Sequence, residues 1–311
     1  MKWKILVSAP YLKIDLDRFL SWFKEHDMDI DVAEQTERME EADLLEVIDR
    51  YDGVVCGDDR FTEDVYKKAK KLKVISKWGT GIDSINKDIA EKYGVKVFNT
   101  PDAFSHPVAD TVLAFMLSFS RNLIAHDKLM KEGNWEKIKG KTLGEQTLGI
   151  IGCGNVGTRV ARRAYGFGMK ILAYDIKKIP AHVCEQYGIS QVELEELLKQ
   201  SDFISTNCDL NETSRHILSD SQFSLMKETA IVINTARGGV IDETALVKAL
   251  NENKIAGCGL DVYEMEPLPK DSPLRRMDNV ILLPHNSNSS PKYWERVHIN
   301  TLENLLKGLE E

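Results

Sequence analysis

The sequence lacks the features that would indicate a membrane, secreted or nucleic-acid-binding protein. Its 311 residues contain no apolar run of about 18 residues, the length that a transmembrane helix requires. The first seven residues lead directly into a strand-like segment, without the hydrophobic region of a signal peptide. Acidic residues outnumber basic ones by 49 to 41, so no excess of positive charge favours nucleic acid. We therefore expect a cytoplasmic protein with neither a membrane nor a nucleic-acid partner.

The cysteines lack the pairing that a disulfide-rich or zinc-binding protein would show. Their number is odd and no two form a CxxC motif, which is typical of reduced thiols in a cytosolic protein. We therefore expect no metal site. The composition, 42% hydrophobic and 29% charged, is that of an ordinary globular protein, and the length allows two domains with separate cores. The five cysteines are Cys56, Cys153, Cys184, Cys208 and Cys258.

The most informative segment present is a glycine-rich turn, Gly152-x-Gly154-x-x-Gly157. It lies between the apolar run Leu148–Ile151 and a helical pattern over Val156–Phe167. Strand, glycine turn and helix are the order of a dinucleotide site, in which the pyrophosphate meets the backbone N–H groups at the helix N-terminus. Such a glycine triplet is a weak signal by itself, and a flavodoxin-like domain without nucleotide remains the alternative.

An acidic residue follows at the spacing that a dinucleotide site requires. The apolar run Lys170–Tyr174 ends in Asp175, 18 residues after Gly157 (175 − 157). About 20 residues are expected before the carboxylate that binds the adenosine ribose hydroxyls. Because this acid would repel a 2′-phosphate, the sequence predicts NAD rather than NADP, although Lys177 and Lys178 weaken that preference.

Short strands alternate with amphipathic helices along the chain, as in a parallel sheet covered on both faces. A long helix is expected from about Val108 to Met130. In residues 1–100 we expect strands at Ile5–Val7, Gly53–Cys56, Val74–Ser76 and Val95–Phe98, and helices over Glu40–Arg50 and Thr62–Leu72, with Thr62 as an N-cap. Beyond the glycine turn we expect strands at Phe203–Thr206, Ala230–Asn234, Gly257–Leu260 and Val280–Leu283, and helices near Val192–Lys199, Glu243–Asn251 and Tyr293–Leu309.

Charged and titratable side chains follow the last three of these strands. Arg237 follows the first, Glu264 and Glu266 the second, and His285 the third. Since the carboxyl ends of parallel strands meet at one sheet edge, these residues predict a site for oxidising a 2-hydroxy acid. The guanidinium can hold a carboxylate through two hydrogen bonds. The imidazole can take the hydroxyl proton, and a glutamate can orient the imidazole.

Each of these residues has another interpretation when it is taken singly. Arg237 is then a surface ion-pair arginine, His285 a hydrogen-bonded core histidine, and the two glutamates solvated loop acids. Their coincidence after strands of one nucleotide-binding sheet favours the catalytic interpretation.

Further motifs are distributed over both halves of the chain. Together with the glycine turn they closely resemble the D-isomer-specific 2-hydroxyacid dehydrogenase family over essentially the full length. The motifs are Gly79-Thr-Gly-Ile-Asp-Ser-Ile85, Asn99-Thr-Pro101, Val108-Ala-Asp110, Gly133-Asn-Trp135, Asn234-Thr-Ala-Arg-Gly-Gly239, Gly259-Leu-Asp-Val-Tyr-Glu-Met-Glu-Pro267 and Pro284-His285.

The resemblance implies an α/β fold of two doubly wound parallel-sheet domains. One is a flavodoxin-like substrate (catalytic) domain, residues 1–100 plus 288–311, and the other an inserted Rossmann NAD-binding domain, residues 101–287. The resemblance also implies a homodimer, with the long helix and the segment around Trp135 at the interface.

The resemblance also assigns roles to individual residues. Arg237, Glu266 and His285 are the catalytic three, and Glu266 is preferred to Glu264 because the family's glutamate directly precedes the proline. Substrate-binding positions are Lys77, Gly79, Thr80 and Gly81. Cofactor-binding positions are Gly152, Gly154, Asn155, Val156, Gly157, Asp175, Asn207, Thr235, Ala236 and Asp261.

Three segments depart from the family pattern. Asn207-Cys-Asp-Leu-Asn211 replaces a His-x-Pro-Leu-Thr run that normally flanks the cofactor. Asn286-Ser-Asn288 replaces Ile-Gly-Gly, so we expect Asn286 and Ser287 to adopt a backbone geometry that glycine would ease. Cys56–Arg60 occupies a loop where phosphoglycerate-type relatives often place an arginine, and Lys77 stands where an arginine often precedes the glycine turn.

The leading functional prediction is an NAD-dependent D-2-hydroxyacid dehydrogenase. Overall similarity favours the D-3-phosphoglycerate branch, with Lys77 and Arg60 able to meet an anionic tail. Glycerate or hydroxypyruvate, lactate-type and bulkier acids remain open. The alternative from another class is a non-enzymatic, NAD(H)-sensing protein that resembles a corepressor.

Overall fold

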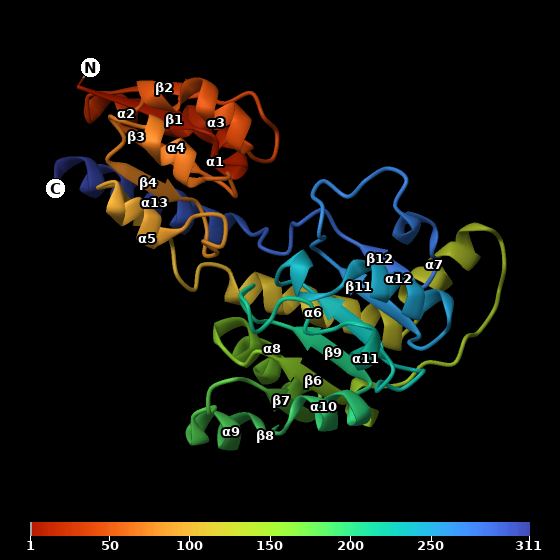
Figure 1. The fold of residues 1–311 in the computed structure, drawn as a ribbon. Helices are drawn as coiled ribbons and strands as arrows, with labels where there is room; N and C mark the ends of the chain where they lie inside the picture. Colours follow the sequence, from red (N-terminus) through yellow and green to blue (C-terminus); the bar gives the residue numbers. More distant parts are fainter. Residues whose placement is uncertain (1) are drawn as a thin grey trace. The chain divides into compact units, whose positions relative to one another are not determined.

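The computed structural model describes residues 2–311, which divide into two compact α/β units (Figure 1). Unit 1 comprises the chain up to Phe104 together with Ser289–Glu311, and unit 2 is Ser105–Asn288. The first division lies four residues after the expected boundary at 100, and the second lies one residue after the expected boundary at 287.

Unit 1 is built on a five-stranded sheet in which every neighbouring pair is parallel. Its order, β2-β1-β3-β4-β5, is the flavodoxin-like doubly wound order, as expected. The sequence did not predict β2, an edge strand whose two aspartates interrupt its apolar pattern. The strands are β1 Trp3–Val7, β2 Met28–Val32, β3 Gly53–Cys56, β4 Val74–Lys77 and β5 Lys96–Phe98.

The C-terminal helix α13, Pro291–Glu310, belongs to unit 1 and packs against β3, β4 and β5. Its Gly308 allows this approach, since a Cβ there would lie 2.3 Å from a Val74 methyl. The helix expected over Glu40–Arg50 forms as α3 followed by the 3₁₀ turn η2. Thr62 stands at the N-cap of α4, but its hydroxyl donates to Glu41 Oε1 (2.8 Å) instead of capping the helix. The other helical segments are α1 Pro10–Ile14, η1 Leu16–Phe19, α2 Leu20–Glu25, α3 Glu41–Val47, η2 Ile48–Arg50, α4 Glu63–Lys68 and α5 Lys87–Lys92.

Unit 2 contains a seven-stranded parallel sheet in the order β12-β11-β10-β9-β6-β7-β8. Six strands, β8-β7-β6-β9-β10-β11, follow the 3-2-1-4-5-6 order of a Rossmann fold, and β12 extends it at one edge. This topology confirms the predicted fold class. The strands are β6 Thr147–Ile151, β7 Lys170–Tyr174, β8 Ile189–Gln191, β9 Phe203–Thr206, β10 Ile231–Asn234, β11 Gly257–Leu260 and β12 Val280–Leu282.

Both faces of this sheet are covered by helices, and successive strand residues alternate between two apolar cores. Ile231 and Ile233 of β10 pack into a cluster with side chains of α6 and α8, whereas Val232 packs with side chains of α10 and α12. The helical segments are α6 Ser105–Ser120, α7 Leu123–Lys131, η3 Leu143–Glu145, α8 Asn155–Gly166, α9 Ala181–Tyr187, α10 Leu194–Gln200, α11 Asp220–Phe223, η4 Gly238–Val240, α12 Glu243–Asn251 and η5 Pro273–Arg276.

The single long helix expected over Val108–Met130 is wrong, because the chain breaks into α6 and α7. Asn122 adopts a left-handed conformation (φ 51°), and its side chain donates to the Lys139 carbonyl oxygen (3.1 Å). Within residues 2–311 no single helix is long and apolar enough to span a membrane, and α6 and α7 reach that threshold only as a pair bent by 59°.

Helix α7 and the arm that follows it expose several apolar side chains. Leu123, Ile124 and Met130 are exposed, and Trp135 is 81% exposed. This is the segment that the family resemblance placed at a dimer interface, and the homodimer stays a prediction.

Candidate active site

The glycine turn lies at the carboxyl end of β6, next to the point where the strand order reverses between β6 and β9. Gly152 has φ 87°, and a Cβ there would lie 2.7 Å from Cys208 N. A Cβ at Gly157 would lie 2.2 Å from the Gly152 carbonyl oxygen. Around Gly154, in contrast, no heavy atom of residues 2–311, its chain neighbours aside, lies within 4 Å of the Cβ position. Packing therefore requires the outer two glycines, while the backbone at the middle one is open to a ligand.

Helix α8 begins at Asn155, directly after this turn, with Val156 in its first turn. Its twelve residues give it the N-terminal N–H groups and the dipole that favour an anion. Asp175 follows β7 and lies beside the turn. Its Oδ2 accepts a hydrogen bond from Cys153 N (2.8 Å) and its Oδ1 from Lys177 N (2.9 Å). The acid and the glycine turn, which the sequence linked by spacing alone, are thus joined directly.

The loop after β10 is held by Asn234, a buried residue. Its Oδ1 accepts hydrogen bonds from Thr206 Oγ1 (2.8 Å) and Ala236 N (3.1 Å), and its Nδ2 donates to the Arg237 carbonyl oxygen (3.0 Å). Thr235, between them, is only 8% exposed, and its hydroxyl has no hydrogen-bond partner within residues 2–311. A buried hydroxyl without a partner provides bonding capacity for a ligand.

Asn207, the first residue of the departing segment, turns its side chain back onto its own strand. The Nδ2 group donates to the carbonyl oxygen (3.0 Å) and the hydroxyl (3.1 Å) of Ser205. The site at the carboxyl edge of β6, β7 and β10 nevertheless fits a dinucleotide, because it combines an open helix N-terminus, an acid and an unpartnered hydroxyl. The residues that would hold NAD there are Gly154, Asn155, Val156, Asp175 and Thr235.

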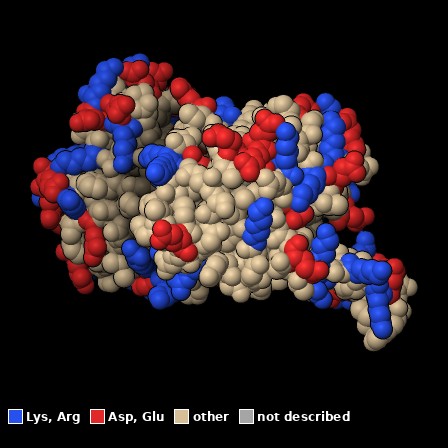
Figure 2. Space-filling view, turned by 90° about the horizontal axis from the view of Figure 1, so that it is seen from below, with Lys and Arg blue, Asp and Glu red and all other residues tan. Residues whose placement is uncertain are grey.

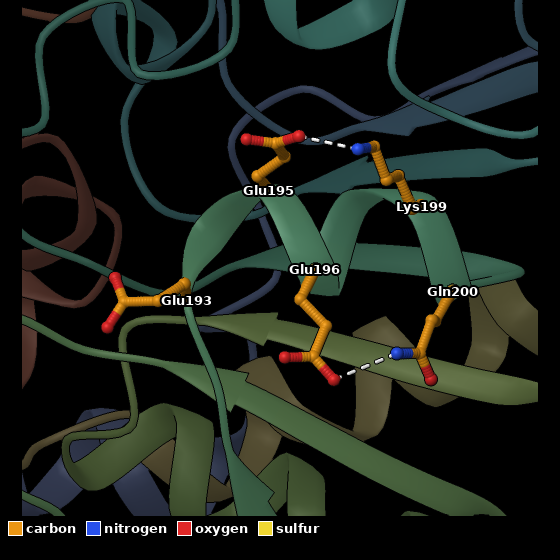
Figure 3. Close-up of a pocket in the computed structure, with 5 residues that line it drawn as sticks. All are labelled: Glu193, Glu195, Glu196, Lys199 and Gln200. Atoms are coloured by element: carbon orange, nitrogen blue, oxygen red, sulfur yellow. Dashed lines mark hydrogen bonds and ion pairs between the residues drawn. The ribbon is translucent and has the colours of Figure 1, made fainter.

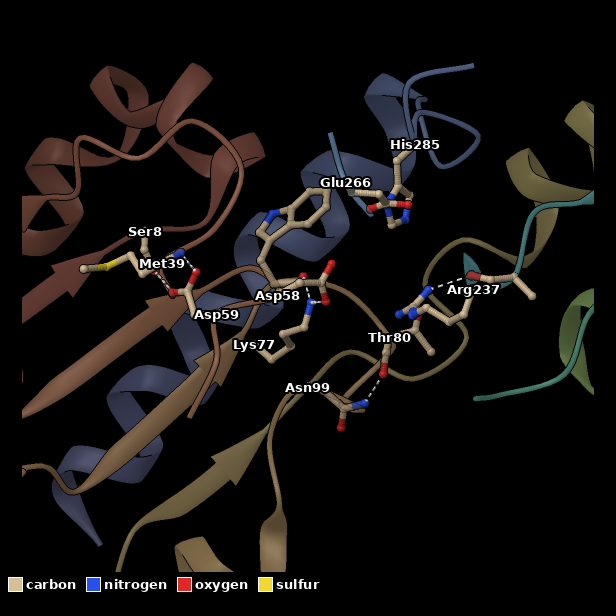
Figure 4. A network of polar contacts seen from close by, with 12 residues as sticks. Ser8, Met39, Asp58, Asp59, Lys77, Thr80, Asn99, Arg237, Glu266 and His285 are labelled. Atoms are coloured by element: carbon tan, nitrogen blue, oxygen red, sulfur yellow. Dashed lines mark hydrogen bonds and ion pairs between the residues drawn. The ribbon is translucent and has the colours of Figure 1, made fainter. Parts of the chain in front are cut away.

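Arg237 leads into the 3₁₀ turn η4 and donates from Nη1 to the Ala236 carbonyl oxygen (2.9 Å) (Figure 4). The next residue must be glycine, since a Cβ at Gly238 would lie 1.9 Å from the Tyr263 carbonyl carbon. The motif that contains the arginine is thus dictated by close packing between the loops that follow β10 and β11.

Asp261 connects the loop after β11 to the loop after β12. It is fully buried, and its Oδ1 and Oδ2 accept hydrogen bonds from Asn286 N (2.8 Å) and Ser287 N (3.0 Å). Its own carbonyl oxygen accepts from His285 N (2.8 Å). Burial raises the pKa of the Asp261 carboxyl, and these donors oppose the rise. Asp261 thereby fixes the backbone that carries the histidine, in addition to its predicted place beside the cofactor.

The backbone strain in this loop lies at His285 itself, which has φ 51°. We expected Asn286 and Ser287 to take a geometry that favours glycine, but neither has positive φ. The left-handed conformation of His285 costs roughly 1–3 kcal/mol, as it does in any non-glycine residue, and it persists only where the surrounding structure holds it. The three hydrogen bonds from the backbone of His285, Asn286 and Ser287 to Asp261 hold it here.

His285 and Glu266 form a pair, with 2.8 Å between Nδ1 and Glu266 Oε2 (Figure 4). The second carboxylate oxygen, Oε1, accepts from Tyr263 N (2.9 Å), so the glutamate is held from both sides. When Nδ1–H donates to the carboxylate, Nε2 is the ring nitrogen that exchanges a proton with a substrate.

Glu264, the alternative candidate, lies away from this histidine. Its Oε1 is 2.6 Å from Nε2 of His216, and its backbone N–H donates to Glu243 Oε2 (3.3 Å). Burial raises the pKa of the Glu243 carboxyl. The structure therefore pairs Glu266 with His285 and places Glu264 in a separate cluster. His216 was missed by the sequence reasoning, and no motif surrounds it that could have indicated its partner.

In unit 1 two of the sequence motifs form one turn. Thr100 N donates to the Gly79 carbonyl oxygen (2.9 Å), and the Thr80 hydroxyl donates to the Thr100 carbonyl oxygen (3.0 Å). Asn99 Nδ2 donates to the Thr80 carbonyl oxygen (2.6 Å) (Figure 4). Gly79 has φ 113°, which explains the glycine. Gly81 follows in this turn, half-buried.

Lys77, at the end of β4, is buried, and its Nζ lies 3.0 Å from Asp58 Oδ1 (Figure 4). The expectation that Lys77 meets an anionic tail is weakened by this contact, because a carboxylate already compensates the ammonium charge.

Two other surface features carry no catalytic chemistry. An open depression along α10 is lined by Glu193, Glu195, Glu196, Lys199 and Gln200 (Figure 3). Lys199 pairs there with Glu195, and Gln200 with Glu196. On the face drawn in Figure 2, basic and acidic side chains are interspersed.

Residues 2–311 contain no cluster of three or more His, Cys, Asp or Glu side chains that could hold a metal. The predicted absence of nucleic-acid and membrane partners, and the cytoplasmic location, stay predictions.

Comparison with known proteins places this geometry in a family. A family model described as "D-isomer specific 2-hydroxyacid dehydrogenase, NAD binding domain" matches residues 113–287. A hydroxypyruvate reductase of Thermotoga maritima is 40% identical over 280 residues, covering 88% of this chain and 90% of the relative. A glyoxylate reductase of Korarchaeum cryptofilum is 37% identical over 298 residues, covering 93% and 89%.

A D-3-phosphoglycerate dehydrogenase of Methanocaldococcus jannaschii is 41% identical over 311 residues, or 98% of this chain, but the chain spans only 57% of that relative. Among solved structures, a D-lactate dehydrogenase of Aquifex aeolicus complexed with NAD and lactic acid has a TM-score of 0.85 at 28% identity, covering 96% of this chain and 93% of that one. These findings confirm the predictions of an NAD-dependent oxidoreductase and of NAD as the cofactor.

Proposed function

The chain belongs to the D-isomer-specific 2-hydroxyacid dehydrogenase family, and we propose that it interconverts a short, unphosphorylated 2-keto acid, glyoxylate or hydroxypyruvate, with the corresponding 2-hydroxy acid. The observation that carries the reaction is the pair formed by His285 and Glu266, with Arg237 on the loop of a neighbouring strand. These groups provide a proton donor, its orienting carboxylate and a carboxylate-binding guanidinium.

In this mechanism the Arg237 guanidinium holds the substrate carboxylate through paired hydrogen bonds. The family resemblance implies further backbone donors at Gly79–Gly81. NAD(H), which Gly154, Asn155, Val156, Asp175 and Thr235 would hold, would supply the hydride for reduction and accept it in oxidation. His285, protonated in the reductive direction, donates its Nε2 proton to the carbonyl oxygen as C2 is reduced. Glu266 keeps the imidazole in place and stabilises its protonated form.

Two of the relatives support the short substrates by their names, a hydroxypyruvate reductase and a glyoxylate reductase. D-3-phosphoglycerate is the second candidate, and the relative that covers 98% of this chain supports it. The compensated charge of Lys77 favours the unphosphorylated acids.

The test follows the absorbance of NADH with the purified protein and a panel of acids. Glyoxylate, hydroxypyruvate and phosphohydroxypyruvate are offered with NADH, and D-glycerate, D-lactate and D-3-phosphoglycerate with NAD. We expect the highest kcat/KM with glyoxylate or hydroxypyruvate. Tight NADH binding without turnover of any acid would instead support the corepressor-like alternative.

The role of Arg237 is tested by Arg237→Ala, with Arg276→Ala, on the exposed η5 turn, as the control. Loss of charge-assisted hydrogen bonds to the substrate should lower kcat/KM by roughly 100-fold, while the control stays near the wild-type value. An Arg237→Ala enzyme with near-normal kcat/KM would contradict the mechanism.

A further inference from the structure

The ion pair between Lys77 and Asp58 joins the ends of two neighbouring strands of unit 1. Strands β3 and β4 pair in parallel, with Cys56 opposite Lys77, so the loop that begins at Gly57 lies beside the lysine. Lys77 is only 4% exposed, and its Nζ is 3.0 Å from Asp58 Oδ1. Two residues later along the chain begins the turn at Gly79 that is predicted to meet the substrate carboxylate.

A second carboxylate, Asp59, lies next to Asp58 but is engaged elsewhere. It is 0% exposed and accepts hydrogen bonds from the Ser8 hydroxyl and from Met39 N (2.8 Å) (Figure 4). These bonds anchor the loop to the end of β1, so Asp58 is held in position by a fixed neighbour. Burial raises the pKa of the Asp59 carboxyl. The loop thus brings one acidic side chain, Asp58, to the buried lysine, while the other anchors the loop.

The ion pair changes how strongly the region beside the Gly79 turn attracts a substrate that carries a second anionic group besides its carboxylate. A lysine alone at this position would attract a phosphate or carboxylate tail. With Asp58 at 3.0 Å the ammonium is compensated, and an incoming anion meets the like charge of Asp58 as well. Arg60 is the other cation of the loop, and its backbone N–H donates to the Met39 carbonyl oxygen (3.0 Å).

We propose that Asp58 is a specificity-determining residue that makes the enzyme reject 2-keto acids with a second anionic group, by compensating the charge of Lys77. The inference rests on the proposed function, since it assumes that the substrate lies at the Gly79–Gly81 turn. It predicts that removing the Asp58 charge converts Lys77 into a binding group for a phosphorylated substrate.

The experiment compares kcat/KM for phosphohydroxypyruvate with that for hydroxypyruvate, both with NADH, in wild-type and variant enzymes. In Asp58→Asn the ratio of the two values should rise roughly 10- to 100-fold, mainly through a lower KM for the phosphorylated acid. In the double variant Asp58→Asn/Lys77→Met the gain should disappear. Raising the ionic strength should reduce the gain, because salt screens the interaction with the phosphate.

Asp64→Asn is the matched control, since Asp64 is an exposed acid that pairs with Lys67 on α4. It should leave the ratio unchanged. Asp58→Ser is a second variant, should the asparagine enzyme fail to fold by circular dichroism, and it should shift the ratio in the same direction.

The inference is overturned if neither Asp58 variant raises the ratio, or if the wild-type enzyme already turns over phosphohydroxypyruvate as well as hydroxypyruvate. It is also overturned if the gain survives in the double variant, which would assign the tail to Arg60. A wild-type enzyme that reduces neither glyoxylate nor hydroxypyruvate would overturn the proposed function itself, and this result differs from an unchanged ratio in an active enzyme.

Discussion

The two units share one architecture but use the carboxyl ends of their strands differently. In unit 2 the edge retains bonding capacity, since the backbone at Gly154 is open and the buried Thr235 hydroxyl has no partner within residues 2–311. In unit 1 the corresponding side chains bind one another, as Lys77 does with Asp58 and Asp59 with Ser8. The comparison indicates that the strand ends of unit 2 are left open for a cofactor. In unit 1 the charged side chains at the strand ends compensate one another.

Unit 2 also contains two histidine–glutamate pairs of similar geometry. Nitrogen and oxygen are 2.8 Å apart in His285–Glu266 and 2.6 Å apart in His216–Glu264. Only the first lies on a loop that Asp261 fixes through three hydrogen bonds. The nitrogen–oxygen distance therefore does not show which histidine is the proton donor. The loop fixed by Asp261 distinguishes His285.

The largest expected effect separates these two pairs. His285→Gln should lower kcat by about 10²- to 10⁴-fold, because general acid–base catalysis is lost. His216→Gln, the matched control, should stay within a few-fold of the wild type. NADH binding, measured by fluorescence titration, should be similar in both variants. Equal losses of kcat in the two variants would contradict the assignment of His285 as the proton donor.

The second prediction tests whether the open edge of unit 2 selects the cofactor by charge. Asp175→Ser removes the carboxylate beside the glycine turn and leaves the exposed Lys177 and Lys178 near it. The kcat/KM ratio for NADPH over NADH should rise roughly 10- to 100-fold, since the repulsion of a 2′-phosphate is lost. Glu185→Gln, on the exposed side of α9, is the control. An unchanged ratio would show that Asp175 does not select the cofactor.

The smallest effect concerns a polar network buried inside unit 1. His298 is 0% exposed, its Nδ1 accepts from Trp78 Nε1 (2.9 Å), and its Nε2 lies 3.3 Å from Asp15 Oδ2. Burial lowers the pKa of His298 below its usual 6.5, and Asp15 opposes this. As the pH falls through about 6.5, the unfolded chain therefore binds a proton before the folded protein does, and the stability of the folded state decreases.

Denaturant midpoints at pH 7.5 and pH 5.5 measure this effect. The decrease on acidification should be smaller in His298→Gln than in the wild type, because the neutral side chain no longer titrates. His182→Gln, an exposed substitution, should retain the wild-type decrease. A decrease of the same size in His298→Gln would show that other groups cause the acid sensitivity.

Much of unit 2 was predictable because its signals are local. The expected strands at Phe203–Thr206 and Gly257–Leu260 and the helix at Glu243–Asn251 form with the predicted bounds. Apolar runs flanked by turns specify such strands, and residues just after them must share one edge of a parallel sheet. The helix break at Asn122 was not predictable in this way, since it depends on a hydrogen bond to Lys139, 17 residues away.

By itself the sequence determined the α/β class, the glycine turn with its acid, and the place of Arg237, Glu266 and His285 after neighbouring strands. Periodicity and spacing along the chain carry that information. Only the tertiary structure decided the partners that no motif indicates, such as His216 for Glu264 and Asp58 for Lys77. Partners are set by which segments pack together: Asp58 lies just after β3 and Lys77 ends β4, and the two meet because these strands pair in one register.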